Sequence, residues 1–325
     1  MQLPPELASV LDEVLGSVPE GVLRRAAQEL SRRYRAGAPG AALVRSDEDA
    51  LAYVAYRLPA TYAALSAALR RSAAQLCDLH PATLLDAGAG PGTALWAARA
   101  VYGTIRTATL IERDARMAAL GRRLGADALA DVRWLASDLA ADWQAPPADL
   151  VCAAFVLGEL PGAARDDVLM RLWSRTQGVL LLVEPGTPEG HDRIARARAL
   201  LLQQGARTVA PCPHDLDCPL APPDWCHFAQ RVERTRIHRR IKGELPYEDE
   251  KFAYAALTPL APQRPPSRVI RRPELHGGHL YLGLCEAEGT RTVVVSRRDK
   301  EAWRAARGLA WGDPGPRPPD RGEGS

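Results

Sequence analysis

The chain of 325 residues lacks any apolar run approaching the roughly 18–20 residues that are needed to span a bilayer. The segment from Met1 to Glu13 carries three acids and lacks a basic stretch followed by an apolar one, so no signal or transit peptide is expected. The chain also lacks a large excess of charge of either sign, because 42 Lys and Arg against 39 Asp and Glu leave a net charge of +3. These absences exclude a membrane protein and give no overall argument for nucleic-acid binding. With 46% hydrophobic residues, the chain is predicted to be a soluble globular protein of the cytosol.

The sequence does contain a glycine loop between a short apolar strand and a helix. Thr83–Asp86 is predicted to be the strand, and Thr93–Val101 the helix. Between them, Gly88, Gly90 and Gly92 allow a sharp turn whose backbone can lie close to a ligand. Strand, glycine turn and helix together are typical of the opening of a nucleotide-binding α/β unit.

The residues around the loop indicate which ligand it suits. A dinucleotide fingerprint requires glycine at position 93, which is Thr93 here. Asp86 ends the strand, and its carboxylate would repel a pyrophosphate but can face a cation. S-adenosylmethionine (SAM) carries a sulfonium and an ammonium and no phosphate. The loop therefore predicts a SAM site of the class I methyltransferase type, the alternative being an α/β turn without a ligand.

Two later strands end in acids that fit the same ligand. Glu112 closes the strand that begins at Thr107, where an acid accepts hydrogen bonds from ribose hydroxyls. Asp138 and Leu139 follow another strand and would lie beside adenine, although a helix cap or turn at Asp138 is the competing interpretation.

The remaining strands give the fold class. Residues 149–155 and 177–184 are apolar runs typical of central parallel strands. Strands alternating with helices predict an α/β fold with a Rossmann-like, doubly wound methyltransferase sheet. Residues 5–76 are predicted to form an N-terminal helical cap, with a helix start at Ser46.

The catalytic machinery is less clearly marked. The loop after residue 155 lacks the Asn/Asp-Pro-Pro-Tyr/Phe motif of methyltransferases that modify base amino groups. Cys152 lies inside a strand and is expected to be core rather than a nucleophile. Glu159 is a candidate general base, with a role in the loop or as a cap as the alternative.

A proline-rich segment carries three cysteines, Cys212, Cys218 and Cys226, with the spacing C-x5-C-x7-C. This spacing fits neither a zinc ribbon nor a ferredoxin motif. Cys285, late in a predicted strand, is our choice for a fourth ligand. The rival ligands are His214, His227 and His279. Four thiolates suit zinc or a [4Fe–4S] cluster, and inert buried thiols are the remaining alternative.

A basic segment follows Cys226 directly. Six of its residues are positively charged: Arg231, Arg234, Arg236, Arg239, Arg240 and Lys242. A stripe of this kind suits a phosphate backbone, and we predict contact with RNA. A solvated helix face is the alternative.

The predicted organisation has five parts. They are a helical region over 1–78, a SAM-binding core over 79–206, a Cys-rich basic insertion over 207–274, a C-terminal hairpin over 275–300 that completes the sheet, and a helix end with a disordered tail over 301–325.

Four groups of residues together resemble one family, over roughly residues 45–300. They are the loop from Asp86 to Thr93, Glu184-Pro-Gly-Thr187, the cysteines with Trp225-Cys-His-Phe228, and Asp249-Glu-Lys-Phe-Ala-Tyr254. The family is that of the methyltransferase-like small-ribosomal-subunit assembly factors of mitochondria and their bacterial relatives.

The resemblance implies a SAM-binding domain and association with small-subunit ribosomal RNA. Methyl transfer to that RNA is the leading hypothesis. The alternatives are a non-catalytic assembly factor that uses SAM structurally, and a methyltransferase of another substrate with a structural zinc site. The resemblance also implies a [4Fe–4S] cluster on Cys212, Cys218, Cys226 and Cys285. The missing presequence favours a bacterial member located in the cytoplasm.

Overall fold

The computed structural model describes residues 1–35, 44–243 and 245–316, apart from the side chains of Tyr34, Arg35 and Lys242. The helices of this part are α1 Pro5–Gly16, α2 Glu20–Arg35, α3 Asp47–Tyr56, α4 Leu58–Ala73, α5 Thr93–Tyr102, α6 Ala115–Arg123, α7 Gly162–Ser174, α8 Pro188–Gln203, α9 Arg236–Lys242 and α10 Lys300–Ala306. The strands are β1 Thr83–Ala87, β2 Thr107–Ile111, β3 Asp131–Leu135, β4 Ala148–Ala154, β5 Thr176–Pro185, β6 Arg207–Ala210, β7 Phe228–Glu233, β8 Tyr247–Thr258, β9 Arg268–Val269, β10 Glu274–His276, β11 His279–Glu286 and β12 Gly289–Ser296.

The main sheet has the strand order β3-β2-β1-β4-β5-β8-β6, and β7 pairs with the far half of β8. Strands β1 to β5 pair in parallel, and β8 is antiparallel to β5. The order reverses between β1 and β4, so a crevice is expected beyond their carboxyl ends. This is the Rossmann-like methyltransferase sheet that the sequence predicts.

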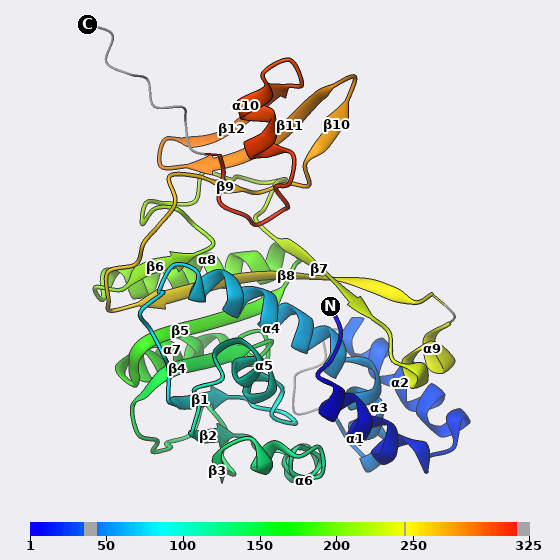
Figure 1. Ribbon diagram of the computed structural model, residues 1–325. Coiled ribbons are helices and arrows are strands. Elements are labelled where there is room, and N and C mark those ends of the chain that lie inside the picture. The colour runs from blue at the N-terminus through cyan, green and yellow to red at the C-terminus, as the bar shows by residue number, and fades with distance from the viewer. Residues whose placement is uncertain (36–43, 244, 317–325) are drawn as a thin grey trace, which may run out of the picture.

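Helices cover the two faces of this sheet (Figure 1), and an apolar cluster lies on each face. Alternate side chains of the central strands, such as Leu84 and Leu85, point into different clusters. One cluster packs beneath α4 and α5, and the other beneath α7 and α8. Because both faces are buried, the central strands read as continuous apolar runs, which is why the sequence marks them clearly.

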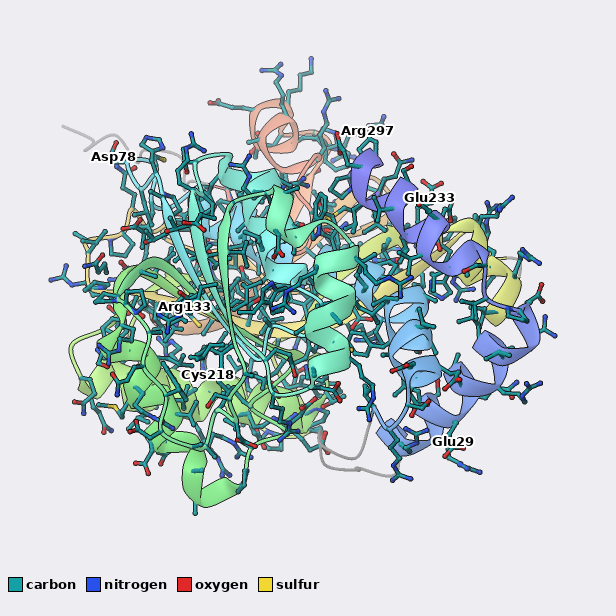
Figure 2. The ribbon with its side chains drawn as sticks, turned by 90° about the horizontal axis from the view of Figure 1, so that it is seen from below. Glu29, Asp78, Arg133, Cys218, Glu233 and Arg297 are labelled. Carbon is teal, nitrogen blue, oxygen red and sulfur yellow. The ribbon has the colours of Figure 1, made fainter. Side chains whose placement is uncertain are left out.

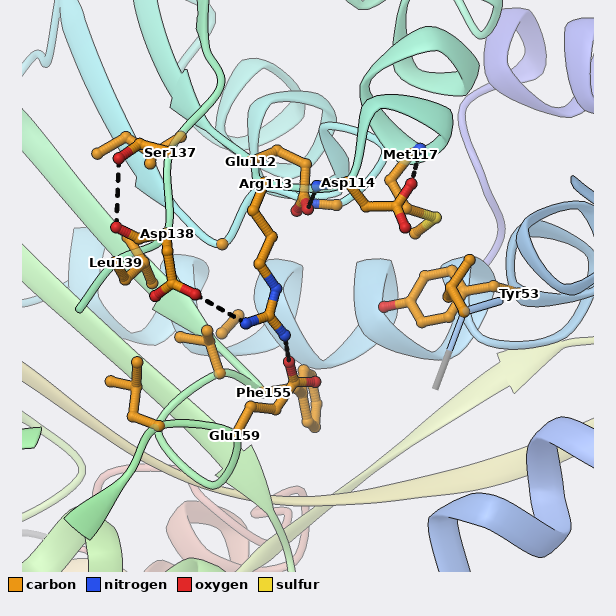
Figure 3. Close-up of a pocket in the computed structure, with 17 residues that line it drawn as sticks. Tyr53, Glu112, Arg113, Asp114, Met117, Ser137, Asp138, Leu139, Phe155 and Glu159 are labelled. Carbon is orange, nitrogen blue, oxygen red and sulfur yellow. Dashed lines mark hydrogen bonds and ion pairs between the residues drawn. The ribbon is translucent and has the colours of Figure 1, made fainter. Parts of the chain in front are cut away.

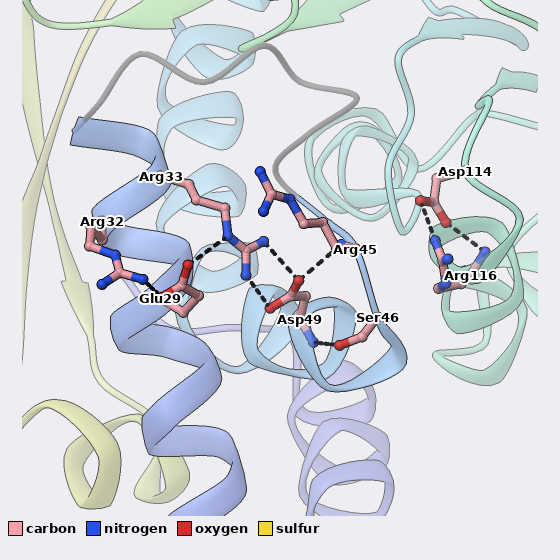
Figure 4. Close-up of polar contacts among 8 residues, drawn as sticks. All are labelled: Glu29, Arg32, Arg33, Arg45, Ser46, Asp49, Asp114 and Arg116. Atoms are coloured by element: carbon pink, nitrogen blue, oxygen red, sulfur yellow. Dashed lines mark hydrogen bonds and ion pairs between the residues drawn. The ribbon is translucent and has the colours of Figure 1, made fainter.

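The N-terminal helices form the predicted cap, on the side of the sheet where α9 also lies (Figure 1). Ser46 begins α3 as an N-cap, its hydroxyl accepting a hydrogen bond from the Asp49 amide. Asp49 is 4% exposed and is held by both terminal nitrogens of Arg33, at 2.8 and 3.0 Å, and by the Arg45 amide (Figure 4). This buried ion pair fixes α2 against α3.

The C-terminal hairpin departs from the prediction. The strands β11 and β12 pair as expected, with Cys285 opposite Thr290, but they belong to a separate sheet with β9 and β10. The antiparallel place beside β5 is taken by β8, whose residues 252–258 are buried in succession. That run is buried on both faces, whereas β11 alternates between buried and exposed residues and so suits a one-sided sheet.

Two of the predicted boundaries change with this topology. Residues 207–274 are not an insertion outside the sheet, because β6, β7 and β8 are strands of it. A helix end with a disordered tail was predicted over 301–325. The helix is α10, Gly315 after it donates its amide to the Ser267 carbonyl, and residues 317–325 lie outside the described residues.

Candidate functional site

The glycine loop lies at the crevice expected from the strand order. Gly88, Gly90 and Gly92 all have positive φ, at 73°, 54° and 76°. A Cβ on Gly88 would lie 2.7 Å from Cγ2 of Val156, in the loop that follows β4. The glycine loop therefore packs directly on the loop that follows β4. A cavity of about 340 Å³ opens beside it (Figure 3).

The predicted cofactor residues divide into two groups. Five line this cavity: Gly88, Gly90, Glu112, Asp138 and Leu139. The other two lie beneath it. Gly92 faces Ala126 and Leu110 and so serves the packing of α5, while Asp86 is buried in the sheet at 2% exposure.

Glu112 connects β2 to the glycine loop. One carboxylate oxygen accepts the Gly90 amide at 2.8 Å, and the other accepts the Asp114 amide at 2.7 Å. Burial raises the pKa of Glu112, and the two amides oppose that shift. Each oxygen keeps a second lone pair, and Glu112 lines the cavity.

Asp86 is a buried carboxyl whose Oδ2 has no hydrogen-bond partner among the described residues. Burial, and after it the Glu112 carboxylate, raise the pKa of Asp86 to about 8. The side chain is therefore protonated at neutral pH until a positive charge comes close. The idea that Asp86 faces a cation stays a prediction.

Arg113 crosses the cavity between two acids. Its Nη1 lies 3.0 Å from Asp138 Oδ2, and its Nη2 lies 4.0 Å from Glu159 Oε2 (Figure 3). The Ala140 amide and then Arg113 lower the pKa of Asp138. Because Asp138 accepts the Ala140 amide, it forms the turn given as the competing interpretation, and it also lines the cavity. Burial, opposed by Arg113, raises the pKa of Glu159 to about 7. A carboxyl with such a pKa can exchange a proton at neutral pH.

Sequence reasoning missed several residues of the cavity wall. Tyr53 comes from α3, so the helical cap contributes to the site. Phe155 has φ of 58°, a backbone conformation that is costly for an aromatic residue, and the Arg57 guanidinium lies 5.8 Å from its ring centre. The apolar run through β4 gives no signal of that strain, and nothing local to Tyr53 indicates a ligand.

Substitution of Gly88 with Ala should disturb both the loop and the ligand. The added methyl would collide with Val156, and the positive φ disfavours any side chain. We expect a loss of about 1–3 kcal/mol in stability and a SAM affinity lowered about tenfold or more, measured by thermal melting and titration calorimetry. Gly162→Ala is the matched control, because a Cβ there meets nothing; equal behaviour of the two variants would contradict the assignment.

The four predicted metal ligands line a second cavity, of about 290 Å³, between α8 and the C-terminal sheet. Cys212, Cys218 and Cys226 come from the loops around β6 and β7, and Cys285 comes from β11. Burial, and after it the Cys212 and Cys218 thiols, raise the pKa of Cys285 to about 12. Figure 2 places Cys218 among the elements of the sheet's α8 side.

Two buried guanidinium groups also line this cavity. Arg268 is 1% exposed and bonds only the Pro211 and Gly312 carbonyls, while its Nη2 has no partner among the described residues. Arg198 is 6% exposed and bonds a hydroxyl and two carbonyls. Neither forms an ion pair within the described part of the chain. Buried charge of one sign calls for a compensating negative group.

Of the three histidines predicted as rival ligands, one lies beside a cysteine of this cavity. His214 Nε2 lies 3.8 Å from Cys285 Sγ, whereas His227 stacks on Trp225 and His279 is exposed on β11. His191 on α8, which sequence reasoning missed, lies 3.9 Å from Cys218 Sγ. Within the described residues, no three His, Cys, Asp or Glu side chains are grouped so that they could hold a metal ion. The predicted metal centre is therefore not shown, although its four cysteines share one cavity.

The predicted RNA-binding stripe is partly neutralised. Three of its arginines pair with acids: Arg231 with Asp249, Arg234 with Glu248 and Arg240 with Glu20. Arg236 and Arg239 on α9 are exposed and form no ion pair with the described side chains, and the side chain of Lys242 lies outside the described residues. The stripe stays a prediction, carried by fewer residues than expected.

Three of the four sequence motifs behind the family resemblance meet around the end of β5. Trp225 Nε1 donates to the Gly186 carbonyl at 3.1 Å, and Pro185 pairs with Phe252 of β8. The family model of the mitochondrial small ribosomal subunit protein Rsm22 matches residues 47–316, which is most of the chain. The chain belongs to the Rsm22 family.

Relatives of this Rsm22-family chain include two mitochondrial proteins. The human mitochondrial ribosome assembly protein METTL17 is 31% identical over 293 residues, covering 81% of this chain and 61% of the human protein. The Rsm22-cox11 tandem protein 2 of Schizosaccharomyces pombe, also mitochondrial, is 27% identical, covering 82% of this chain and 43% of that protein. The chain thus spans about half the length of these relatives.

These relatives correct the expected location. A bacterial cytoplasmic protein was expected from the missing presequence, but the family and both relatives are mitochondrial. That expectation rested on the first residues of the given sequence, which spans only part of its relatives' length. None of the helices in the described residues is long and apolar enough to cross a membrane.

Among solved structures, magnesium protoporphyrin IX methyltransferase from Synechocystis with bound SAM has a TM-score of 0.41 and 13% identity, covering 78% of this chain and 96% of that one. N-methyltransferase NodS from Bradyrhizobium japonicum has a TM-score of 0.38 and 13% identity, covering 60% and 84%. These likenesses are too distant to carry an argument about function.

Proposed function

We propose that this Rsm22-family chain binds SAM in the cavity beside the glycine loop and acts on the RNA of the small ribosomal subunit. The observation that carries the SAM assignment is the charge of the cavity wall, where four acids face one arginine. The acids are Glu112, Asp114, Asp138 and Glu159. A wall of this kind suits a ligand with a sulfonium and an ammonium, and it disfavours a pyrophosphate.

The wall residues have distinct roles in this proposal. Glu112 offers its remaining lone pairs to the ribose hydroxyls, and Asp138 with Leu139 flanks the adenine. Asp86 supplies a buried negative charge below the loop once a cation binds. Glu159, with its pKa near 7, is the group suited to take a proton from a substrate.

We also propose that Cys212, Cys218, Cys226 and Cys285 hold a [4Fe–4S] cluster. The four cysteines fit such a cluster as ligands. Their thiolates would place negative charge beside Arg198 and Arg268, which are buried and form no ion pair with the described residues. A single tetrahedral zinc ion is the alternative; its sulfurs would lie about 3.8 Å apart, given Zn–S bonds of about 2.3 Å. When bound, the cluster would cross-link the cysteine loop to the C-terminal sheet.

Association with the small ribosomal subunit is proposed from family membership and from the human relative, a mitochondrial ribosome assembly protein. Arg236 and Arg239 on α9 are the exposed basic residues available for a phosphate backbone. Whether the chain methylates that RNA or only binds SAM while assisting assembly depends on the loop after β4. There, Leu157 donates its amide to the buried Glu184 at 3.0 Å, so the loop is held in place without a recognised catalytic motif.

Labelled SAM, incubated with the holoprotein and small-subunit assembly intermediates, separates these two functions. Transfer of label to RNA that is lost in a Glu159→Gln variant is the result expected of a methyltransferase. Tight SAM binding with no labelled product on any intermediate would establish the assembly factor instead. Absence of both SAM binding and subunit association would contradict the proposal.

A further inference from the structure

A third cavity, a groove of about 570 Å³, lies between the C-terminal sheet and β7, and shares no lining residue with the two cavities described above. Its cations are Arg71 from α4, Arg272 from the loop before β10 and Arg307 after α10. Its aromatic rings are those of Trp303 and Trp311. None of the described residues that line this groove is Asp or Glu.

The positive charges of the three guanidinium groups are little neutralised by nearby carboxylates. Arg71 donates to two backbone carbonyls, that of Trp311 at 2.9 Å and that of Ala67 at 3.4 Å, and forms no ion pair with a carboxylate of the described residues. Arg272 is 71% exposed and its nearest acid, Asp249, is 3.8 Å away, a contact that water screens effectively. Arg307 is exposed and forms no ion pair with any described side chain. The groove is therefore a positively charged surface with apolar rings in its wall.

The groove ends beside the predicted basic segment. Gln230 on β7 lines it, and the next residue, Arg231, lies 4.4 Å from the ring centre of the exposed Tyr247. Figure 1 shows β7 and β8 running from beneath the C-terminal sheet to α9, where Arg236 and Arg239 are exposed. Because Arg231 is paired with Asp249, the exposed arginines of the basic segment that form no ion pair with the described side chains are Arg236 and Arg239.

We infer that this groove binds single-stranded RNA, its arginines contacting phosphates and its tryptophans stacking on bases. The inference rests on the proposed function, which supplies RNA as the partner, and it names where and in which form the RNA binds. Positive grooves with aromatic platforms bind single strands because every base offers a flat face for stacking. Duplex RNA has stacked bases that cannot reach an indole, so the tryptophans contribute only to a single strand.

The test measures binding of a fluorescent, mixed-sequence RNA of about 12 nucleotides to the full-length holoprotein by anisotropy, at several salt concentrations. We expect Arg272→Gln with Arg307→Gln to weaken binding tenfold or more and to flatten the slope of log K against log salt by about 1.4, since each lost phosphate contact removes about 0.7. Trp303→Ala should weaken single-strand binding about fivefold or more with an unchanged slope. Trp303→Phe should retain most of the affinity, and a matched RNA duplex should not respond to Trp303→Ala.

The matched control is Arg298→Gln, an exposed arginine in the turn between β12 and α10 that does not line the groove. If the groove double variant binds like this control while the wild type binds RNA, the groove inference is overturned and the proposed function stands. Loss confined to an Arg236→Gln and Arg239→Gln variant would place the RNA on α9 instead. A wild type that binds no RNA at any salt concentration would overturn both the inference and the RNA part of the proposed function.

Discussion

Replacing Cys226 with Ser is expected to abolish iron and sulfide binding and to lower the stability of the whole C-terminal half of the protein. The serine hydroxyl is a poor ligand, and ligation and folding are coupled at such sites. Loss of the negative group leaves Arg198 and Arg268 buried without compensation. Removing one partner from a buried charge pair costs about 3–5 kcal/mol, so we expect a loss of about 3 kcal/mol or more, measured by denaturation under anaerobic conditions.

Cys77→Ser is the control for that variant, because Cys77 is exposed and lies outside the cavity. It should retain full iron and sulfide and the wild-type melting temperature. Cys285→Ser then tests the fourth ligand, which His214 could replace from its position 3.8 Å away. Cys226→Ser protein with undiminished iron would show that these thiols are inert core residues.

Replacing Asp86 with Asn is expected to stabilise the protein above neutral pH and to weaken SAM binding. The folded-state pKa of Asp86, about 8, exceeds its ordinary value of 3.8, so the folded chain holds a proton that the unfolded chain releases. This carboxyl therefore makes stability fall as pH rises from about 4 to about 8, by up to about 1.4 kcal/mol per pH unit, and the contribution levels off above that. Asn titrates in neither state, so the variant should lose this slope while its SAM affinity drops about tenfold or more.

Calorimetric titration with SAM at about pH 6 and about pH 8 measures the ligand side of this linkage. In the wild type, affinity should increase with pH, because the bound cation requires the ionised carboxyl. Burial also raises the pKa of Glu159, to about 7, so Glu159→Gln is examined in parallel to separate the two groups. If Asp86→Asn binds SAM as tightly as the wild type at both values, Asp86 has no part in binding the cation.

The sequence predicts the main sheet well because its strands are buried on both faces and its helices have clear periodicity. The predicted helix of Thr93–Val101 is α5, Thr93–Tyr102, and the Ser46 helix start is confirmed by its N-cap hydrogen bond. The position of β8 in the main sheet was not predicted. Its apolar residues follow an acidic stretch, and they lie outside the α/β alternation that marks the parallel strands. Pairing of an antiparallel strand is a long-range choice that local pattern does not encode.

The candidate site shows the same division. Predicted residues of the glycine motif and of the strand ends line one cavity because the strand order brings them to one edge. Tyr53, Arg113 and His191 were missed, since each acts through the position of its helix or loop rather than through a motif. The pairing of Arg231, Arg234 and Arg240 with acids was also hidden, because their partners lie far away in the sequence or on a neighbouring strand.

The most direct test of this account is the iron, acid-labile sulfide and zinc content of the full chain purified without oxygen, with the visible spectrum recorded on the same sample. The account predicts about four iron and four sulfide per chain and a broad absorbance near 400 nm, as expected for one [4Fe–4S] cluster on four cysteines. One zinc per chain with no sulfide, or a chain free of both metals that melts like the Cys77→Ser control, would contradict it.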